Sequence, residues 1–419
     1  MALQETISQA GSLIPAAGHQ EAGSGNPSGR RTGRDGYLFH PLIDFLCLGG
    51  GALIVMLLLL VVRPPASSEP TLALVMLWVA HIINHPHFAH SYQIFYRDFG
   101  QKAFGAHYDP VLRLRYIFAG IVAPLALLAY LLGAVLLQDA RALGLTANLM
   151  FFLVGWHYVK QGYGMLIVCS VLKRQFFNDI EKRVLLVNAY VVWAADWLIA
   201  NWVFSERNFW GLAYYTFDMP GWLVVLAIAL SAGTTAATLW MLVRKWASEE
   251  RRLPFNGVIA YLVTLYAWLL FALDPFYLLV IPACHSLQYL VVVWRYQLNA
   301  ERDRAAQTRA ADESLLSDPA YRDNGDRPRW AVRVQSWIAK RATARFTVFV
   351  STGLLLGFLG FWFLPAALEI GIPVDQAVFG PSLFFFLVWI FINVHHYLLD
   401  NVMWRRGNPD TGRYLFAPR

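Results

Sequence analysis

The chain has 419 residues, of which 34 are Lys or Arg and 27 are Asp or Glu, giving a net charge of +7. Only 15% of the residues are charged and 57% are hydrophobic, whereas a typical soluble domain is about 25% charged. This composition excludes an ordinary soluble enzyme and favours several membrane spans. The three cysteines lie in apolar runs without a CxxC spacing, which excludes a disulfide framework and a cysteine metal motif.

The first forty residues are rich in Gly, Ser and scattered charges and contain no apolar run, which predicts a disordered cytoplasmic tail. Beyond them, runs close to the roughly 20 apolar residues that cross a bilayer recur along the chain. They predict transmembrane helices at residues 42–62, 71–96, 112–138, 147–172, 184–204, 221–243, 257–273, 275–297, 345–366 and 379–403. The predicted fold class is all-α, a polytopic membrane protein of about ten transmembrane helices.

The loops after every second predicted helix hold most of the Lys and Arg residues, whereas the alternate loops are nearly free of them. By the positive-inside rule, both termini are expected in the cytoplasm, and the expected location is a bacterial inner membrane. The predicted parts are a tail (1–40), helices one to eight (41–297), a cytoplasmic linker with an amphipathic helix (298–344), helices nine and ten (345–403) and a second tail (404–419). No basic stripe with interleaved aromatic residues is present in the sequence, so nucleic acid is not an expected partner.

Eight of the 11 histidines lie inside four predicted helices, all of them even-numbered and expected to run inwards. They are His81, His85, His87 and His90 in helix two, His157 in helix four, His285 in helix eight, and His395 and His396 in helix ten. All lie about ten to nineteen residues from the start of their helix, which gives overlapping depths at 1.5 Å per residue. Intramembrane ionisable groups are usually functional, and neutral imidazole is the commonest metal ligand. All eight are candidate metal ligands, of which at least four are expected to bind; the alternative for each is a hydrogen bond between helices.

The spacing in helix two limits which histidines can bind together. His81 and His85 are four residues apart and share a helix face. His87 and His90 point to another side, unless a kink at Pro86 turns them towards the first pair.

Other polar residues accompany the histidines on the same helices. Asp400 lies one turn after His396, as a carboxylate ligand or as an acceptor for an imidazole N–H. Lys160 could pair with Asp400, meet a substrate head group or extend to the inner surface. The side chains expected either to orient ligands or to cross-link helices are Asn84, Lys160, Gln161, Gln288, Tyr289 and Asn393.

An all-imidazole set with at most one carboxylate favours iron, copper or zinc over magnesium and calcium. Histidine-rich sites on membrane helices are typical of non-haem iron desaturases, hydroxylases and related oxygenases. One or two non-haem irons are therefore the expected cofactor, with O₂ as co-substrate. Of the desaturase histidine boxes, only His81 and His85 provide a match, and His395-His396 lacks the upstream histidine.

The order of the histidine elements resembles the Brp/Blh membrane β-carotene dioxygenases, which cleave carotene to retinal. The matching elements are Pro86-His87-Phe88-Ala89, His157-Tyr158, His285-Ser286 and His396-Tyr397-Leu398-Leu399-Asp400. The chain differs in having extra histidines at 81, 85 and 90 and in lacking a second histidine soon after His285. The resemblance implies iron-dependent O₂ chemistry on a hydrophobic substrate, with the catalytic residues His87, His157, His285, His396 and Asp400.

The expected function is that of an integral-membrane oxygenase acting on a lipid or isoprenoid substrate, including carotenoid-like ones, with an electron donor as a further partner. A fatty-acyl desaturase or hydroxylase is an alternative within the same chemistry. A histidine-rich metal or proton-coupled transporter is an alternative from another class, because polar groups at the midplane also mark permeation paths. A haem protein with paired axial histidines is a third.

Overall fold

The computed structural model describes residues 36–62, 65–106, 108–203, 207–209, 212–248, 253–272, 277–316, 337, 341–405 and 407–416. Residues Gly36–Arg419 make one compact unit. Within the described ranges it is helical, apart from a short antiparallel ribbon of β1 (Arg207–Phe209) and β2 (Leu212–Tyr214). Residues 1–35 of the predicted tail and most of the predicted amphipathic helix near 330–338 lie outside the described residues. The last part of the predicted tail, 36–40, is described: Leu38 is buried, and the Leu38 and Phe39 N–H groups donate to the Asp44 carboxylate.

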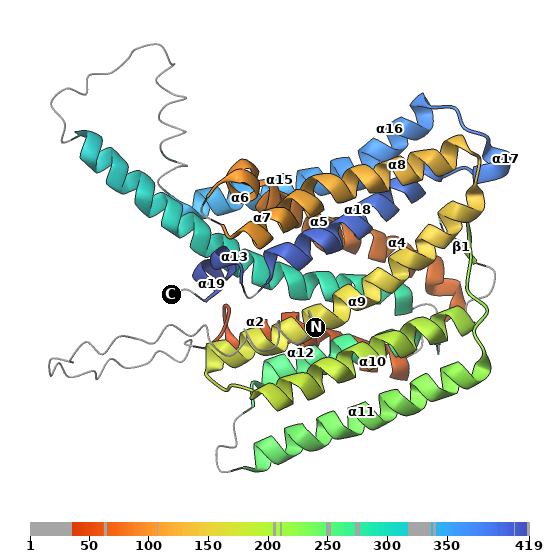
Figure 1. Cartoon of the computed structure of the whole chain (residues 1–419), viewed down its shortest axis with the longest axis horizontal. Coiled ribbons are helices and arrows are strands. Elements are labelled where there is room, and N and C mark those ends of the chain that lie inside the picture. The colour runs from red at the N-terminus through yellow and green to blue at the C-terminus, as the bar shows by residue number, and fades with distance from the viewer. Residues whose placement is uncertain are drawn as a thin grey trace. The chain divides into compact units, whose positions relative to one another are not determined.

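The elements of the first half are α2 (Pro41–Phe45), η1 (Leu46–Gly50), α3 (Gly51–Val61), η2 (Ala66–Ser68), α4 (Glu69–Val79), η3 (Ala80–Asn84), α5 (His85–Tyr96), α6 (Phe99–Phe104), α7 (Pro110–Ile117), η4 (Phe118–Val122), α8 (Ala123–Leu136), α9 (Ala140–Lys173) and α10 (Asp179–Val203). After the ribbon follow α11 (Gly221–Ala247), α12 (Phe255–Tyr266), η5 (Trp268–Ala272), α13 (Tyr277–Leu316), α15 (Ala342–Phe358), η6 (Leu359–Phe363), α16 (Leu364–Gly371), α17 (Gln376–Phe379), α18 (Leu383–Met403) and α19 (Pro409–Leu415). Figure 1 shows most long helices side by side, with the end of α13 extending past them.

Eight helical segments of the described chain are long and apolar enough to cross a membrane. They are Pro41–Val61, Glu69–Tyr96, Pro110–Leu136, Ala140–Lys173, Asp179–Val203, Gly221–Ala247, Ala342–Gly371 and Leu383–Met403. The prediction of an all-α membrane protein is therefore confirmed, with eight candidate spans in the described chain.

The two remaining predicted spans differ from the others. The span predicted at 257–273 is a shorter apolar helix, Phe255–Leu270. The span predicted at 275–297 is the first part of α13, which continues to Leu316 through the predicted boundary at 297. Residues 298–316 are rich in Ala, Leu and Arg, which favour helix, so no break separates the apolar and polar parts.

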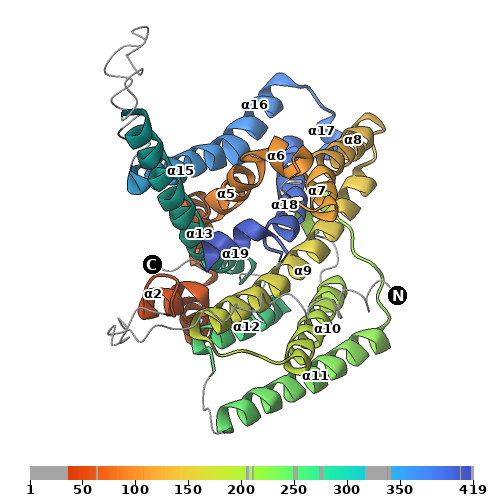
Figure 2. The ribbon, with the colours of Figure 1, turned by 60° about the vertical axis from the view of Figure 1, so that its left-hand side comes forward.

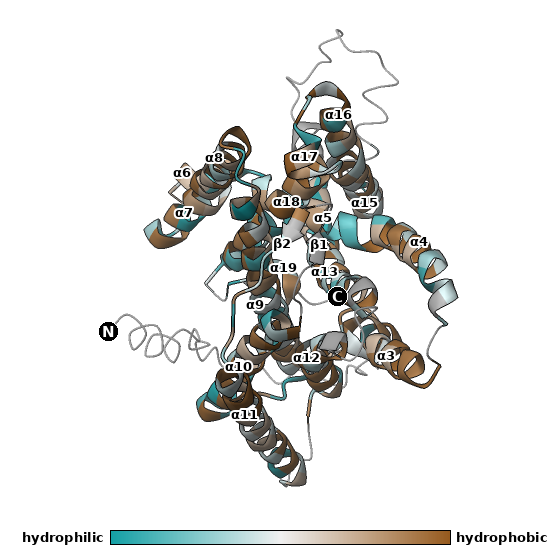
Figure 3. Cartoon of the chain, turned by 90° about the vertical axis from the view of Figure 1, so that its right-hand side faces the viewer, coloured by the Kyte–Doolittle hydropathy of each residue, from teal (hydrophilic) through white to brown (hydrophobic). Residues whose placement is uncertain are grey.

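The helices differ in how far they are enclosed by the rest of the protein. In the most apolar window of α18, 72% of the residues are buried, and in α9 56% are buried, against 17% in α11. Helix α18 packs against α5 and α9, whereas α11 packs against α10, and Figure 2 shows α18 inside the bundle and α11 at its margin. Figure 3 shows hydrophobic residues covering outer helices such as α3, α8 and α11. Apolar side chains that face outwards are expected where lipid is the solvent.

Three of the π-helical segments precede a proline at the same spacing. Segments η3, η4 and η6 are followed by Pro86, Pro124 and Pro365, each at the second position of the next helix. Proline has no N–H and its ring clashes with the carbonyl four residues back, so the preceding turn widens. At Pro124 the carbonyl four residues back belongs to Gly120, and it accepts a hydrogen bond of 2.8 Å from the Tyr96 hydroxyl.

The predicted second tail is partly ordered. Its residues Pro409–Leu415 form α19, in which Asn408 caps the N-terminus by accepting from the Asp410 N–H. The Asn299 side chain on α13 donates to the Tyr414 carbonyl at 2.7 Å. The Thr411 hydroxyl donates to the Met403 carbonyl at 2.6 Å, so this segment packs against the middle of α13 and the end of α18.

Candidate metal centre

Three histidines from three different helices meet in the interior. His87 on α5, His157 on α9 and His396 on α18 each offer a ring nitrogen, and these atoms lie within 4.8 Å of one another. All three side chains are buried. Helices α9 and α18 are the two most buried of the candidate spans, so the cluster lies where the bundle is best enclosed.

His285 on α13 borders this group. Its ring centroid is 5.4 Å from that of His87 and 5.1 Å from that of His157. The ring stacks on Tyr158 at 3.5 Å, with 6° between the planes. Both of its nitrogens lack a hydrogen-bond partner among the described residues, so they remain available for a ligand at the cluster.

Four ring nitrogens of the cluster have no hydrogen-bond partner in the described chain. This holds for Nε2 of His87, Nε2 of His157 and both nitrogens of His396. An unsatisfied buried polar group costs about 1–3 kcal/mol, so this many in one place is unfavourable unless something binds them. A shared transition-metal ion satisfies converging imidazole lone pairs. The residues present therefore fit a metal of the iron, copper or zinc type.

Asp400 supplies the carboxylate of the cluster from one turn below His396. Its Oδ2 lies 3.5 Å from His396 Nε2 and 3.9 Å from His157 Nε2. Its Oδ1 accepts a hydrogen bond of 2.9 Å from the Tyr289 hydroxyl. The carboxylate is thus held in place by one oxygen while the other faces the histidines, where it can bind a cation or balance its charge.

A hydrogen-bond chain determines which nitrogen of His87 is free. The Ser286 hydroxyl donates to Asn84 Oδ1 at 2.6 Å, so its oxygen can accept from His87 Nδ1, which lies 3.2 Å away. With the proton on Nδ1, the Nε2 lone pair faces the cluster. Asn84 and Ser286 thus hold His87 in the tautomer that a metal ligand needs.

A second chain supports Asp400. The Tyr289 hydroxyl also contacts the Ser91 hydroxyl at 2.5 Å, and the Trp404 indole N–H donates to it at 3.3 Å. Tyr289 therefore connects α5, α13 and α18 around the carboxylate. Its ring also meets that of His87 edge-on at 4.5 Å.

Other residues expected to orient ligands contact the site less directly. Gln161 donates to the His285 carbonyl at 3.1 Å and to Gln288 Oε1 at 2.8 Å. Lys160 contacts Asn401 Oδ1 at 3.2 Å and lies over the Trp156 ring. The structure thus places Lys160 beside Asn401 rather than Asp400, and gives both glutamines helix-linking contacts.

Asn393 acts on the site through one neighbour. It accepts a hydrogen bond of 2.9 Å from the Tyr397 hydroxyl. The Tyr397 ring is stacked on His157 at 4.8 Å. Asn393 therefore fixes a ring that covers one side of the cluster.

His81 and His85 form a separate pair. Their ring centroids are 5.8 Å apart, and His85 is stacked on Phe361 of η6 at 4.4 Å. Phe88 lies between this pair and the cluster, with its ring 5.2 Å from Phe361 and 4.8 Å from His396. The expected kink at Pro86 therefore does not bring the histidines of this segment together, because the π-helical turn η3 precedes it and separates their directions.

His90 also lies apart from the cluster. Its Nδ1 contacts Gln93 Oε1 at 2.8 Å, and its Nε2 accepts from the Trp294 indole at 3.4 Å. The ring is stacked on Phe349 of α15 at 4.2 Å.

His395 points away from its neighbour His396. Its Nε2 donates to the Ala119 carbonyl at 2.9 Å, so its Nδ1 accepts from the Tyr92 hydroxyl, also at 2.9 Å. Both nitrogens of His395 are thus used in contacts between helices.

Sequence reasoning did not identify Ser91, Tyr397 or Trp404 as site residues. Ser91 and Tyr397 each lie four residues after a residue of the candidate set, namely His87 and Asn393. Residues four apart share a helix face, so this spacing was the available signal. Trp404 follows the end of α18 and carried no such signal.

Comparisons with protein-family models, curated proteins and solved structures give no match for this chain.

Proposed function

We propose that the protein is an integral-membrane, histidine-ligated non-haem iron oxygenase that acts with O₂ on a hydrophobic lipid or isoprenoid substrate. One observation carries the proposal: the converging ring nitrogens of His87, His157 and His396 are buried and have no hydrogen-bond partner in the described chain. A buried imidazole group in an apolar bundle is suited to a transition metal and to a substrate dissolved in the bilayer.

The proposed ligand set is narrower than the eight histidines of the sequence. His87, His157 and His396 hold the ion, and His285 and Asp400 are the groups that complete its coordination. His90 and His395 are left out because both of their nitrogens have protein partners. His81 and His85 are left out because they form a separate pair, on the far side of Phe88 and Phe361 from His396. The proposed set matches the elements on which the resemblance to the Brp/Blh dioxygenases rests, and this agreement supports iron over zinc or copper.

A ferrous ion bound there would supply the O₂ binding and activation that oxygenase chemistry requires. The residues of the chain provide the surroundings. Tyr158 and Tyr397 cover the faces of His285 and His157 and keep water from them. Phe88 extends the apolar lining from His396 to Phe361, on the side from which we propose that an apolar chain approaches.

The metal content of the purified protein tests this proposal. Detergent-purified protein, handled anaerobically, should contain about one iron per chain, and extraction of the co-purified lipids gives candidate substrates. His157→Ala and His396→Ala should each lose the metal and the O₂-dependent turnover of those lipids, because each removes one of few ligands. Size-exclusion chromatography checks that the variants remain folded.

The control is His90→Gln, which keeps a side chain able to form hydrogen bonds and should retain the iron. Full metal content in both alanine variants would contradict the ligand set. Folded protein that never contains a metal would contradict the oxygenase proposal and favour a proton or ion pathway. Zinc alone would favour hydrolytic or structural chemistry.

We also propose ten membrane spans with both termini in the cytoplasm, in a bacterial inner membrane. The ion pairs between Lys or Arg and Asp or Glu in the described chain support this topology. They are Arg97–Glu301, Arg304–Glu301, Arg345–Glu301, Arg413–Asp303, Lys182–Asp179 and Lys245–Glu181. Four of them, all except the pairs Arg304–Glu301 and Lys182–Asp179 within one helix, join different segments that the charge pattern predicts on the same, cytoplasmic side.

A further inference from the structure

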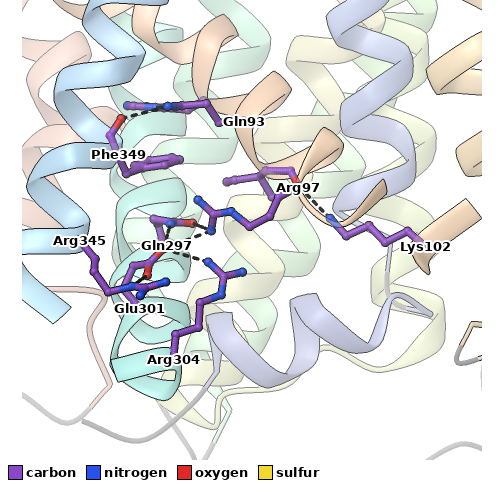
Figure 4. A network of polar contacts seen from close by, with 10 residues as sticks. Gln93, Arg97, Lys102, Gln297, Glu301, Arg304, Arg345 and Phe349 are labelled. Atoms are coloured by element: carbon purple, nitrogen blue, oxygen red, sulfur yellow. Dashed lines mark hydrogen bonds and ion pairs between the residues drawn. The ribbon is translucent and has the colours of Figure 1, made fainter. Parts of the chain in front are cut away.

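A group of arginines gathers around one buried carboxylate at the end of the bundle, away from the histidine cluster. Glu301 on α13 is 3% exposed and pairs with Arg97 at 3.2 Å, Arg304 at 2.9 Å and Arg345 at 2.5 Å. Figure 4 shows the three guanidinium groups approaching Glu301 from three directions, with Gln297 beside them. Asp98, next to Arg97 in the chain, is a second acidic group that acts on Arg97, so three positive charges face two negative ones and an excess of positive charge remains.

The three arginine side chains that carry this charge are partly buried. The side chains of Arg97, Arg304 and Arg345 are 27%, 28% and 26% exposed. Burial lowers the pKa of Arg97, and the neighbouring Arg304 lowers it further. Like charges kept together in this way repel one another, so a second anion would stabilise the group.

The arginines keep donors for such an anion. In the hydrogen bonds of the described chain, Arg97 and Arg304 use Nη1 and Arg345 uses Nε. A guanidinium has five N–H donors in a planar fork, so most of them remain for another acceptor. Phosphate oxygens match this fork in pairs.

The position of the group points to a lipid. Arg97 directly follows the candidate span Glu69–Tyr96, and Arg345 lies in the first turn of Ala342–Gly371. Both therefore lie at a membrane boundary. Trp337, 51% exposed and covered by the Arg341 guanidinium at 5.0 Å, is the kind of residue found at that boundary.

The surface next to Arg345 suits acyl chains. Val348, Leu355 and Leu356 on α15 are 49%, 55% and 42% exposed. Their spacing from Arg345 places them on adjoining parts of one helix face. An anion held at Arg345 thus has an apolar strip of helix beside it, as a phospholipid requires.

We propose that Arg97, Arg304 and Arg345 bind the phosphate of an anionic phospholipid, whose acyl chains lie along the exposed face of α15. Glu301 holds the three guanidinium groups together so that their outer N–H donors face the membrane surface. This site is independent of the histidine cluster and of the function proposed for it.

Binding of defined lipids to delipidated, full-length protein tests this proposal. Native mass spectrometry and thermal unfolding should show binding of phosphatidylglycerol in preference to phosphatidylcholine. Arg345→Gln should weaken phosphatidylglycerol binding about tenfold, the effect of losing one charge-assisted contact. Arg304→Gln should do the same, and it serves as the second variant if Arg345→Gln fails to fold.

The matched control is Arg413→Gln. Arg413 is 57% exposed and pairs with Asp303, two residues from Glu301, but lies outside the arginine group. It should leave lipid binding unchanged. Equal binding of the two lipids, wild-type affinity in both test variants, or an equal loss in the control would overturn the proposal. If millimolar inorganic phosphate displaced the bound phosphatidylglycerol, the site would be assigned to a free anion, and the proposal of a lipid site would be overturned.

Discussion

At the scale of single residues, the buried histidines differ in whether one or both of their ring nitrogens have a hydrogen-bond partner. His90 and His395 use both nitrogens in protein contacts: His90 with Gln93 on its own helix and with Trp294 on α13, and His395 with two neighbouring helical segments. His87 uses one, with Ser286, and leaves the other facing the cluster. An imidazole can bind a metal only through a nitrogen that holds no proton and has no other partner. The partners of each ring thus separate His87 from His90 and His395, whereas His85, whose nitrogens also lack a hydrogen-bond partner among the described residues, is set apart by its position beside Phe361.

Ser286→Ala tests this reasoning directly. It removes the acceptor for the His87 Nδ1 proton, so the ring is no longer held in one tautomer. We expect metal affinity to fall about 10–100-fold, as for other groups that orient metal-binding histidines. A competition titration with a chelator measures the change.

Ser231→Ala is the matched control, because the Ser231 hydroxyl on α11 has only a 3.5 Å contact with the Val191 carbonyl. Unchanged metal affinity in Ser286→Ala would show that Ser286 does not orient His87.

A buried lysine outside the spans makes stability depend on pH. Burial lowers the pKa of Lys102 to about 8, although Asp410 and Asp98 act against this shift. Its ammonium donates to the Ile94 and Phe95 carbonyls at 2.7 and 3.3 Å. The unfolded chain keeps this proton up to a pKa near 10.5. Between these two pKa values the unfolded state binds more protons, so the contribution of Lys102 makes stability rise with pH.

Lys102→Gln should remove this dependence. The difference in unfolding free energy between wild type and variant should change by about 3 kcal/mol from pH 8 to pH 10.5. Chemical unfolding in detergent across this range measures it. Parallel pH profiles for the two proteins would show that Lys102 keeps its proton throughout.

At the scale of helices, glycine allows α15 to approach α5 closely. A Cβ on Gly353 would lie 2.2 Å from His90 Cε1, and one on Gly357 would lie 2.9 Å from His85 Cβ. The two glycines form a GxxxG sequence, which is typical of close helix pairs in membranes. This motif was readable in the sequence, and it explains why His85 and His90 pack against α15 while His87 points into the bundle.

Gly357→Leu should therefore separate α5 from α15. The side chain would meet the His85 backbone carbon at 3.1 Å, which cannot move without the helix. We expect a loss of about 1–3 kcal/mol in unfolding free energy, the usual cost of overpacking, measured by unfolding in detergent.

Gly233→Ala on α11 is the control, since its Cβ would meet nothing within 4 Å. Wild-type stability in Gly357→Leu would show that the two helices are not held this close.

The π-helical turns also affect how helices pack, because their backbone carbonyls accept hydrogen bonds from side chains of other helices. In η4 the Ala119 and Gly120 carbonyls accept from His395 and Tyr96. In η1 the Leu48 carbonyl accepts from Gln288 at 2.5 Å. A regular helix would use these carbonyls internally. The widened turns therefore provide backbone acceptors for polar contacts between helices.

For the whole molecule, the arrangement of charge gives a testable topology. The first turn of α10 and the last turn of α11 pair with each other through Glu181 and Lys245. Lys182 is expected on the cytoplasmic side and Arg141 on the opposite side. Replacing each by cysteine in a background without Cys47, Cys169 and Cys284 allows labelling from outside.

An impermeant maleimide should label Arg141→Cys in intact cells and Lys182→Cys only after permeabilisation. The reversed pattern would invert the topology. Labelling of both positions from the same side would show that the number of spans between them is even.

The sequence predicted much of this fold, because span length and loop charge are local properties. The apolar runs at 42–62, 112–138 and 379–403 correspond closely to Pro41–Val61, Pro110–Leu136 and Leu383–Met403. The hydropathy pattern predicted the end of a helix at residue 297, but α13 continues past it as a polar helix without a break. It also could not reveal the 3₁₀ turn η5 that ends the short apolar helix.

The sequence by itself determined that the protein is a helical membrane protein and that four of its helices carry histidines at similar depth, since both follow from the order of residues along single helices. Only the tertiary structure decided which histidines meet. His395 and His396 are neighbours in the chain, yet one binds the Ala119 carbonyl and the other faces His87 and His157. A helix turns by about 100° per residue, so the rotation and packing of each helix against its neighbours decide where each ring points.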